Sequence, residues 1–419
     1  MNEALWTIFW GVVTFSLLIV IHEGGHFLSA RMFGVKVHEF MLGLPGPAIR
    51  FEGKKTTYGV TAIPLGGYVR IAGMEPGPED PMLAEALASL TRDRTMDGER
   101  LATLMGIDVE HADGLLYTLA DWGAATREDR RSTTYQAVYP VQAASDPAAL
   151  LDAARAETYR ALPMWKRIVV LSAGVVLNLL TAVLVFTVVL SAYGSPEVSL
   201  TIAGVAPTGA AAAAGIVGGD KVTKIGATTL TTWDDLVAAV GKYQPGDQVI
   251  VTVVRKGKTL TFPATLTKGP QGHAFLGVEA GQELVRLTPV KALGQSFVYV
   301  GMMFKAVGDF FRPSTFKTSI SQSSSIIGAS VVVRQSVKLG PWVYAQIVAV
   351  LSLGLGVLNI LPIPPLDGGK VVLELAEGAT GRPLPRAIVI GFSIVGAVLL
   401  FSLIGYLMYA DTVRLITNS

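Results

Sequence analysis

Two histidines and a glutamate near the N-terminus have the spacing of a metal-dependent catalytic motif. The sequence His22-Glu23-Gly24-Gly25-His26 stands at the end of an uncharged apolar stretch. On a helix, residues four positions apart share a face, so both imidazoles can bind one cation while Glu23 stays free as a base. The alternative is a polar helix end that matches the motif by chance. Placing a charged group near the bilayer centre costs about 2.5 to 3.5 kcal/mol, so polar residues inside or at the edge of an apolar helix indicate a function. The motif therefore predicts a metal site.

The third protein ligand is expected to be a carboxylate, because the sequence has no cysteine and only five histidines. Three of these, His38, His111 and His273, lie in polar segments. Asp367, the acid at the end of a late apolar stretch, is the best candidate, and a helix cap is its simpler alternative role. Three protein ligands suit tetrahedral Zn²⁺, which keeps its fourth position for water. We expect one zinc ion per chain.

Prolines interrupt the apolar stretch just before Asp367. The sequence from Asn359 to Gly369 reads NILPIPPLDGG. Proline breaks a helix, and irregular backbone at membrane depth is tolerated only where it lines a cavity or is packed within protein. This segment is therefore expected to lie against other parts of the protein rather than against lipid.

The overall composition is that of a membrane protein. Of the 419 residues, 51% are hydrophobic and 16% are charged, whereas soluble domains carry about 25% charged residues. This excludes a disordered chain and a purely cytosolic globular enzyme. With 34 Lys and Arg against 32 Asp and Glu, the net charge of +2 gives no reason to expect nucleic acid as a partner.

Four uncharged stretches are long enough to cross a bilayer, given about 1.5 Å of rise per residue and about 30 Å of hydrocarbon. The first has no basic segment before it and no small-residue cleavage site, which favours a retained helix over a signal peptide. The third is rich in Gly and Pro, and a buried core helix is its alternative. The predicted spans are Leu5–Ile21, Ile168–Tyr193, about Pro341–Leu366, and Ala387–Ala410.

Basic residues at the span ends predict the orientation, because cytoplasmic flanks carry an excess of Lys and Arg. Such residues follow the first span, precede the second, and fill the connection between the third and fourth. Both connections are therefore expected in the cytoplasm, with both termini and about residues 194–340 outside. The residues that carry this prediction are Arg31, Lys36, Arg160, Lys166, Arg167, Lys370, Arg382 and Arg386, while Arg334 and Lys338 weaken the contrast.

The segments between the spans differ in character. Residues 35–75 read as short strands with Gly and Pro at the turns, and residues 195–285 read as one small β-rich domain. The polar, Ala-rich stretch 76–162 indicates a solvated, largely helical insert without a site of its own. Residues 286–340 form a linker with an amphipathic helix. The predicted apolar helices occupy residues 1–34, 163–194, 341–371 and 386–410. Between them lie the strand region 35–75, the polar insert 76–162, the β-rich domain 195–285 and the linker 286–340.

Taken together, these motifs resemble the site-2 protease family of intramembrane zinc metalloproteases. HEGGH in a first membrane helix, IPLGGYVR over Ile63–Arg70, and NILPIPPLDGG over Asn359–Gly369 carry the resemblance. A β-rich domain between the second and third spans resembles the bacterial regulator-of-sigma-E-protease branch with one PDZ domain. The implied fold is a polytopic α-helical membrane protein with four transmembrane helices, a membrane-associated β-hairpin and an extracytoplasmic PDZ domain, in a bacterial inner or plasma membrane.

The resemblance implies a role for each motif residue. His22, His26 and Asp367 would bind zinc, and Glu23 would be the general base. Asn359 would contact the substrate backbone or the developing oxyanion. The residues that would present an extended substrate are Pro64, Leu65, Gly66, Gly67 and Tyr68, and Asn178, in an AGVVLN sequence where the family has proline at Val175, is a weaker substrate-binding candidate.

The β-rich segment carries the PDZ resemblance. Ala214–Asp220, AGIVGGD, matches a PDZ turn, and PDZ domains bind peptide C-termini by adding a strand to a sheet edge. His273 is expected at the rim of the peptide-binding loop. The residues of that loop are Phe275, Leu276, Gly277 and Val278.

Two segments depart from the family pattern. Gly43–Pro47 reads GLPGP where relatives have GFGP, and Ser324–Gly328 replaces a GPxGI-like stretch. Neither segment contains a predicted zinc ligand or Glu23, so the differences concern the gating of substrate entry rather than the predicted chemistry.

The leading hypothesis is an intramembrane zinc endopeptidase that cleaves single-span membrane proteins, such as anti-sigma factors or signal-peptide remnants, in regulated intramembrane proteolysis. One alternative is a membrane-tethered metalloprotease that acts on soluble proteins. Another is a non-enzymatic PDZ scaffold or metal transporter, although the paired interrupted segments typical of many transporters are absent from the sequence. The expected partners are membrane-protein substrates, peptide C-termini and the lipid bilayer.

Overall fold

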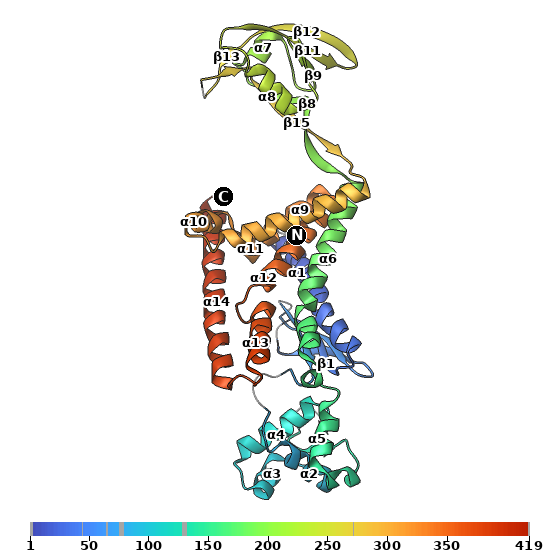
Figure 1. Cartoon of the computed structure of the whole chain (residues 1–419). Coiled ribbons are helices and arrows are strands. Elements are labelled where there is room, and N and C mark those ends of the chain that lie inside the picture. Colours follow the sequence, from blue (N-terminus) through green and yellow to red (C-terminus); the bar gives the residue numbers. More distant parts are fainter. Residues whose placement is uncertain are drawn as a thin grey trace. The chain divides into compact units, whose positions relative to one another are not determined.

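The computed structural model describes residues 3–43, 45–63, 66–74, 79–127, 132–270 and 272–417. It divides into two compact units, one formed by Met1–Phe186 with Ser296–Ser419 and the other by Thr187–Gln295 (Figure 1). The first unit contains the HEGGH motif and Asp367 and therefore holds the candidate site.

Four helices among the described residues are long and apolar enough to cross a membrane. An uncharged helix satisfies its own backbone hydrogen bonds, so it needs no water along its length. These helices are α1 (Glu3–Met32), α6 (Met164–Ala192), α12 (Pro341–Asn359) and α14 (Arg386–Thr417).

The third apolar stretch does not continue to Leu366. Helix α12 ends at Asn359, and a new helix, α13 (Asp367–Thr380), begins at Asp367. The prolines between them remove backbone donors and clash with a helical path, so the chain turns here and Asp367 stands in the first turn of α13. The break thus presents the carboxylate at a helix start.

The connection before α12 is helical throughout most of its length. It contains α9 (Pro289–Asp309), α10 (Pro313–Gln322) and α11 (Ile326–Leu339). Helix α11 packs on α1 so closely that a β-carbon at Gly11 would lie 2.5 Å from Oγ of Ser330. Glu3 at the start of α1 pairs with Arg334 and Lys338 of α11 at 3.0 Å each. These contacts hold the N-terminal half of α1 against the later helices.

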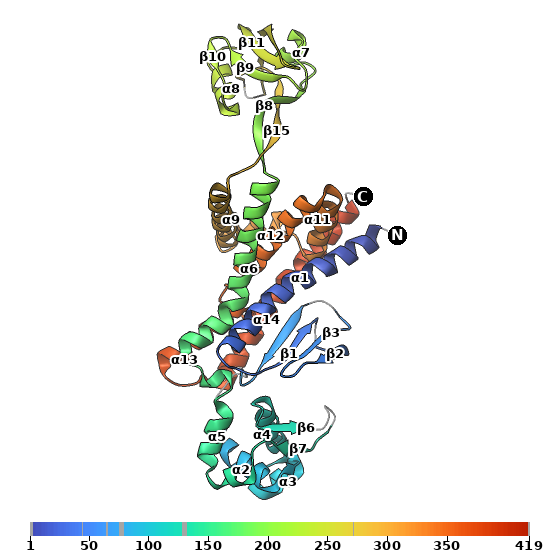
Figure 2. The same ribbon diagram turned by 90° about the vertical axis from the view of Figure 1, so that its right-hand side faces the viewer.

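A four-stranded sheet follows α1 and lies beside it, as Figure 2 shows for β1, β2 and β3. Its order is β2-β3-β1-β4, with β1 and β3 parallel and the other pairs antiparallel. Strand β4 is therefore at the edge and pairs with β1 alone among the described strands. The strands are β1 (Val37–Leu42), β2 (Ala48–Glu52), β3 (Thr57–Thr61) and β4 (Gly67–Ile71).

The hairpin formed by β2 and β3 exposes an apolar face. Ile49 lies opposite Val60 and Phe51 opposite Tyr58, so the four side chains share one face of the hairpin. Ile49 and Phe51 are 71% and 66% exposed. Such a contiguous apolar patch is typical of a surface that contacts a membrane or a partner.

The insert between the sheet and α6 is a small domain with its own core. Buried leucines, including Leu87, Leu101, Leu116 and Leu119, pack its helices together. Asp97, Asp108 and Asp146 cap three of these helices. His111 lies on its surface and pairs with Asp80 at 2.6 Å. Its elements are α2 (Leu83–Asp93), β5 (Thr95–Met96), α3 (Gly98–Met105), α4 (Val109–Asp121), β6 (Ala125–Arg127), β7 (Tyr135–Ala137), α5 (Pro147–Arg155) and the 3₁₀ turns Val141–Ser145 and Tyr159–Ala161.

The second unit is β-rich. Arg255 and the fully buried Asp220 form an ion pair at 2.7 Å, which lowers the pKa of Asp220. Thr232 and Asp235 form a reciprocal cap at the start of α8. The elements are β8 (Ser195–Val205), α7 (Ala210–Ala214), β9 (Lys221–Ile225), β10 (Thr228–Thr229), α8 (Trp233–Val240), β11 (Gln248–Arg255), β12 (Lys258–Thr265), β13 (Thr267–Lys268), β14 (Ala274–Phe275) and β15 (Val278–Val285).

Candidate metal centre

Three side chains from two distant parts of the chain converge at one point. His22 and His26 project from α1, and Asp367 projects from the start of α13. Oδ2 of Asp367 lies 2.9 Å from Nε2 of His22 and 3.1 Å from Nε2 of His26, and the two imidazole nitrogens are 3.4 Å apart. All three residues are buried. The structure thus brings together the three residues that the motifs predict as ligands.

The hydrogen bonding of His26 tests whether this cluster suits a cation. Nδ1 of His26 lies 2.8 Å from the carbonyl oxygen of Val170. A carbonyl oxygen only accepts, so Nδ1 of a neutral ring must carry the proton and Nε2 must present a lone pair. That lone pair faces a carboxylate oxygen and the Nε2 atom of His22. Two nitrogens and one oxygen, oriented by contacts outside the cluster, fit the donor set of zinc.

Asn178 contacts the outer nitrogen of His22. Its Nδ2 lies 3.2 Å from Nδ1 of His22, while its buried Oδ1 has no hydrogen-bond partner among the described residues. A histidine that binds metal through Nε2 carries its proton on Nδ1 and needs an acceptor there. Rotating the amide turns Oδ1 toward that proton. The structure therefore places Asn178 behind His22, although sequence reasoning had assigned it to the substrate.

Replacing Asn178 with leucine is expected to weaken zinc binding by about 10- to 100-fold, the usual cost of losing a group that orients a metal ligand. Competition with a chromogenic chelator measures the affinity. Asn359→Leu is the matched control, because the Asn359 amide donates to the Leu355 carbonyl of its own helix at 2.9 Å. Equal zinc affinity in both variants would contradict the orienting role of Asn178.

Glycines allow α6 to approach the motif. A β-carbon at Gly25 would lie 2.3 Å from the carbonyl oxygen of Ala173, and one at Gly174 would lie 2.6 Å from Nε2 of His26. No L side chain fits at either contact without moving a backbone. Gly24, in contrast, has open space beside it. Of the two motif glycines, Gly25 is thus the one that the packing of α1 on α6 requires.

Glu23 lies beside the metal cluster and is half-buried. Among the described residues its carboxylate has no hydrogen bond or ion pair. Strand β4 begins against it, because a β-carbon at Gly67 would lie 3.4 Å from Cγ of Glu23 and 2.5 Å from Cγ2 of Ile19. Glu23, one residue after the ligand candidate His22, is therefore next to the start of the edge strand.

The other predicted site residues lie in several places. Asn359 is buried at the end of α12, Gly67 and Tyr68 open β4, and the Tyr68 hydroxyl donates to Glu39 at 2.9 Å. Gly66 accepts from the amide of Gly43 at 2.8 Å. Pro64 and Leu65 fall outside the described residues. In the second unit, Phe275 ends β14, Leu276 is buried, Gly277 has a φ of +78°, and Val278 begins β15.

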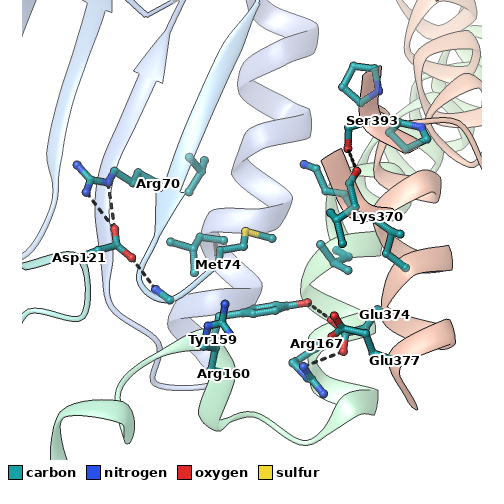
Figure 3. A pocket seen from close by; sticks show the side chains of 18 residues that line it. Arg70, Met74, Asp121, Tyr159, Arg160, Arg167, Lys370, Glu374, Glu377 and Ser393 are labelled. Atoms are coloured by element: carbon teal, nitrogen blue, oxygen red, sulfur yellow. Dashed lines mark hydrogen bonds and ion pairs between the residues drawn. The ribbon is translucent and has the colours of Figure 1, made fainter. Parts of the chain in front are cut away.

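A cavity of about 500 Å³ separates β4 from α13 and α14 (Figure 3). Val69, Arg70 and Ile71 of β4 line one side, and Lys370 and Glu374 of α13 stand opposite. Figure 3 shows Tyr159 reaching across to Glu374, to which its hydroxyl donates at 3.2 Å. The Glu374 carboxylate also pairs with Arg167 at 2.8 Å.

The cavity borders the metal cluster through Lys370. Its ammonium group lies 3.3 Å from Oδ1 of Asp367, which leaves Oδ2 directed at the two histidines. Sequence reasoning did not find the cavity, because its walls come from segments far apart in the chain.

Comparison with known proteins identifies the family. The sequence model of peptidase family M50 matches residues 10–403. The chain belongs to this family.

Similar proteins extend over nearly the whole chain. The zinc metalloprotease RasP of Shouchella clausii is 28% identical over 89% of this chain and 90% of its own length. The probable protease eep of Enterococcus faecalis is 28% identical over 90% of this chain and 92% of its own. Among solved structures, the PDZ domain of an SdrC-like protein from Listeria monocytogenes matches 20% of this chain and 86% of its own, at 19% identity and a TM-score of 0.18.

Membership of family M50 confirms the resemblance predicted from the motifs. The chain is a membrane zinc metalloendopeptidase. Zinc is its cofactor, and proteins are its substrates.

Proposed function

We propose that this M50 peptidase cleaves single-span membrane proteins within or near their apolar segment. The observation that carries the proposal is the position of the metal cluster. His22, Glu23 and His26 project from α1, one of the helices that are apolar enough to cross a membrane. Anti-sigma factors and signal-peptide remnants are single-span proteins of the proposed class.

We assign the chemistry to four side chains. His22, His26 and Asp367 hold one zinc ion per chain, supported by their convergence within 3.4 Å. When bound there, zinc would supply Lewis acidity, which polarises a carbonyl group and makes water more acidic. Glu23 accepts the proton of the attacking water and passes it to the leaving amine. Its lack of an ion-pair partner among the described residues keeps this carboxylate available as a base.

The edge strand β4 presents the substrate in this proposal. The backbone of a membrane helix is internally hydrogen-bonded, so it must unwind before its peptide bonds can be attacked. An extended segment recovers hydrogen bonds by pairing with a free sheet edge. Gly67, the first residue of β4, lies next to Glu23, and the later residues Val69–Ile71 line the cavity. Pro64, Leu65 and Gly66 precede it as further presenting residues, and the Asn359 amide contacts the substrate backbone or the developing oxyanion.

The apolar face of the β2–β3 hairpin supports its association with the membrane. Ile49 and Phe51 would leave water when the hairpin contacts lipid, which favours that contact by about 25 cal/mol per Å² of apolar surface. Both termini and the second unit would lie outside the cytoplasm of a bacterial plasma membrane, and the insert would lie inside. The second unit would act as a PDZ domain, with Phe275 and Val278 in its peptide-binding loop.

The position of the cut tests the proposal. A reporter with one helical span of about 20 apolar residues, interrupted by a Gly-Pro pair and flanked by two soluble tags, is incubated with the full-length enzyme in micelles. Mass spectrometry of the products is expected to place the cut inside or next to the apolar span. Cleavage confined to the soluble tags, or of a soluble protein alone, would favour the tethered protease that acts on soluble proteins.

Filling the cavity is expected to block substrate pairing. Ser393 of α14 lines the cavity, so Ser393→Trp should lower reporter cleavage by about tenfold or more while zinc stays bound. Ser402→Trp is the matched control, because Ser402 is an exposed residue of the same helix. Equal cleavage rates for the two variants would show that substrate does not occupy the cavity.

A further inference from the structure

The last residue of helix α4 joins the insert to the edge strand β4. Oδ1 of Asp121 accepts from Nε and Nη2 of Arg70 in β4, at 3.1 and 3.0 Å. Oδ2 accepts from the amide of Gly73, just after β4, at 2.8 Å. The backbone carbonyl of Asp121 lies 2.5 Å from Nε2 of His38 in β1. One residue of the insert thus holds β1, β4 and the turn that follows β4.

The hydrogen bonds of the Asp121 carboxylate are stronger than ordinary neutral ones, because they involve a charged group and are buried. Both hydrogen bonds from the Arg70 guanidinium converge on Oδ1 of Asp121, and both are charge-assisted. Asp121 is only 3% exposed, so water competes little for its oxygens. Burial alone would lower the pKa of the Arg70 guanidinium, but the charge of Asp121 outweighs it and raises that pKa above its ordinary value.

The insert holds Asp121 rigidly. Helix α4 is anchored in the core of the insert by Leu115, Leu116 and Leu119, all of which are buried. Asp121 directly follows this anchored part of the helix. The carboxylate is therefore fixed relative to the insert, and strand β4, which is hydrogen-bonded to it through Arg70, is held in the same position.

Strand β4 needs such support because it is short and at the sheet edge. It has five residues and pairs with β1 on one side only, among the strands that the structure describes. Hydrogen bonds to one neighbour leave an edge strand free to fray, and a frayed strand cannot pair with a second chain. The contacts of Asp121 add three further hydrogen bonds from outside the sheet.

We propose that Asp121 is a positioning residue for substrate binding, which holds β4 through Arg70 and Gly73 so that its free edge can pair with an extended substrate. In this arrangement the insert carries the residue that keeps the substrate-binding strand in place. The inference rests on the proposed function, in which β4 presents the substrate.

The proposal predicts an effect on the Michaelis constant rather than on turnover. If the strand is in place only part of the time, the apparent affinity for a substrate that binds this strand falls by that fraction. Once the substrate has paired, the zinc ligands and Glu23 are unchanged. A structural role in folding alone would instead reduce the amount of active enzyme and leave the Michaelis constant unaltered.

The experiment compares Asp121→Asn with Asp108→Asn in the full-length enzyme, using the single-span reporter. Asp108 caps the other end of the same helix, and asparagine caps a helix almost as well as aspartate. For Asp121→Asn we expect KM to rise about tenfold, with kcat within about twofold of wild type and zinc content unchanged. Hydrogen exchange of the amides of residues 67–71 should also become faster. Asp108→Asn should match wild type in every measurement.

Two further variants test whether Asp121 acts through its contact with Arg70. Arg70→Gln removes the ion pair but leaves the Gly73 contact, so it should raise KM by no more than Asp121→Asn does, and the double variant should match Asp121→Asn because the two side chains share one contact. Unchanged KM and unchanged exchange in β4 would overturn the inference. A wild-type enzyme that leaves the span of the reporter uncut overturns the proposed function itself, whereas normal cutting of the span with equal KM values overturns this inference alone.

Discussion

Glu23→Gln is expected to lower reporter cleavage by about 10²- to 10⁴-fold while zinc remains bound, the range for loss of a general base. Glutamine has the size of glutamate but cannot accept a proton from water. Glu23 is outside the cluster of His22, His26 and Asp367, so the substitution removes no metal ligand. Single-turnover cleavage measures the chemical step, and elemental analysis measures zinc in the same sample.

Glu3→Gln is the matched control for this substitution. Glu3 stands on the same helix, where it pairs with Arg334 and Lys338 far from the metal cluster. We expect the Glu3 variant to cleave at nearly the wild-type rate. If Glu23→Gln retained full activity with zinc bound, Glu23 would not be the base and the proposed chemistry would be wrong.

Asp367→Ala is expected to abolish activity by releasing zinc. The carboxylate is one of three side chains that form the cluster among the described residues, and its Oδ2 atom faces both histidines. Structural zinc sites bind with about 10–16 kcal/mol in total, so losing one of so few ligands should weaken binding by at least about a hundredfold. Equilibrium dialysis against buffered zinc gives the affinity directly.

Removal and return of the metal complete this test. A chelator should inactivate the wild type, and added zinc should restore its cleavage. The same zinc concentration should not restore Asp367→Ala, whereas Glu377→Ala should bind zinc normally, because the Glu377 carboxylate of the same helix accepts from the amide of Leu384 at 2.9 Å. Wild-type zinc affinity in Asp367→Ala would remove Asp367 from the ligand set.

Local sequence patterns were sufficient to identify the long apolar helices, including α1 with its two histidines, but not the short helix α13 that carries Asp367. Uncharged apolar runs predict membrane helices because hydropathy acts residue by residue, and the structure has helices in these runs. HEGGH predicts two ligands on one face because the helical repeat places His22 and His26 together. Family membership and zinc dependence, both predicted from the motifs, are confirmed by the comparisons.

Other features depend on contacts between distant segments. Asp367 and His26 are 341 positions apart, and only the packing of α13 near α1 brings them to 3.1 Å. The packing of α6 on α1 likewise places the Asn178 amide 3.2 Å from Nδ1 of His22. The insert was predicted as a solvated segment without a site, yet its buried leucines form a core and its Asp121 grips β4.

The sequence by itself therefore determined the long apolar helices, the zinc motif and the family, because each follows from spacing or hydropathy within a short window. The sequence also pointed to Asp367 as the third ligand, but only the tertiary structure showed how it reaches the histidines, where the cavity lies and what holds the edge strand. These features are set by side-chain packing across segments. Local periodicity carries no information about which segments will meet.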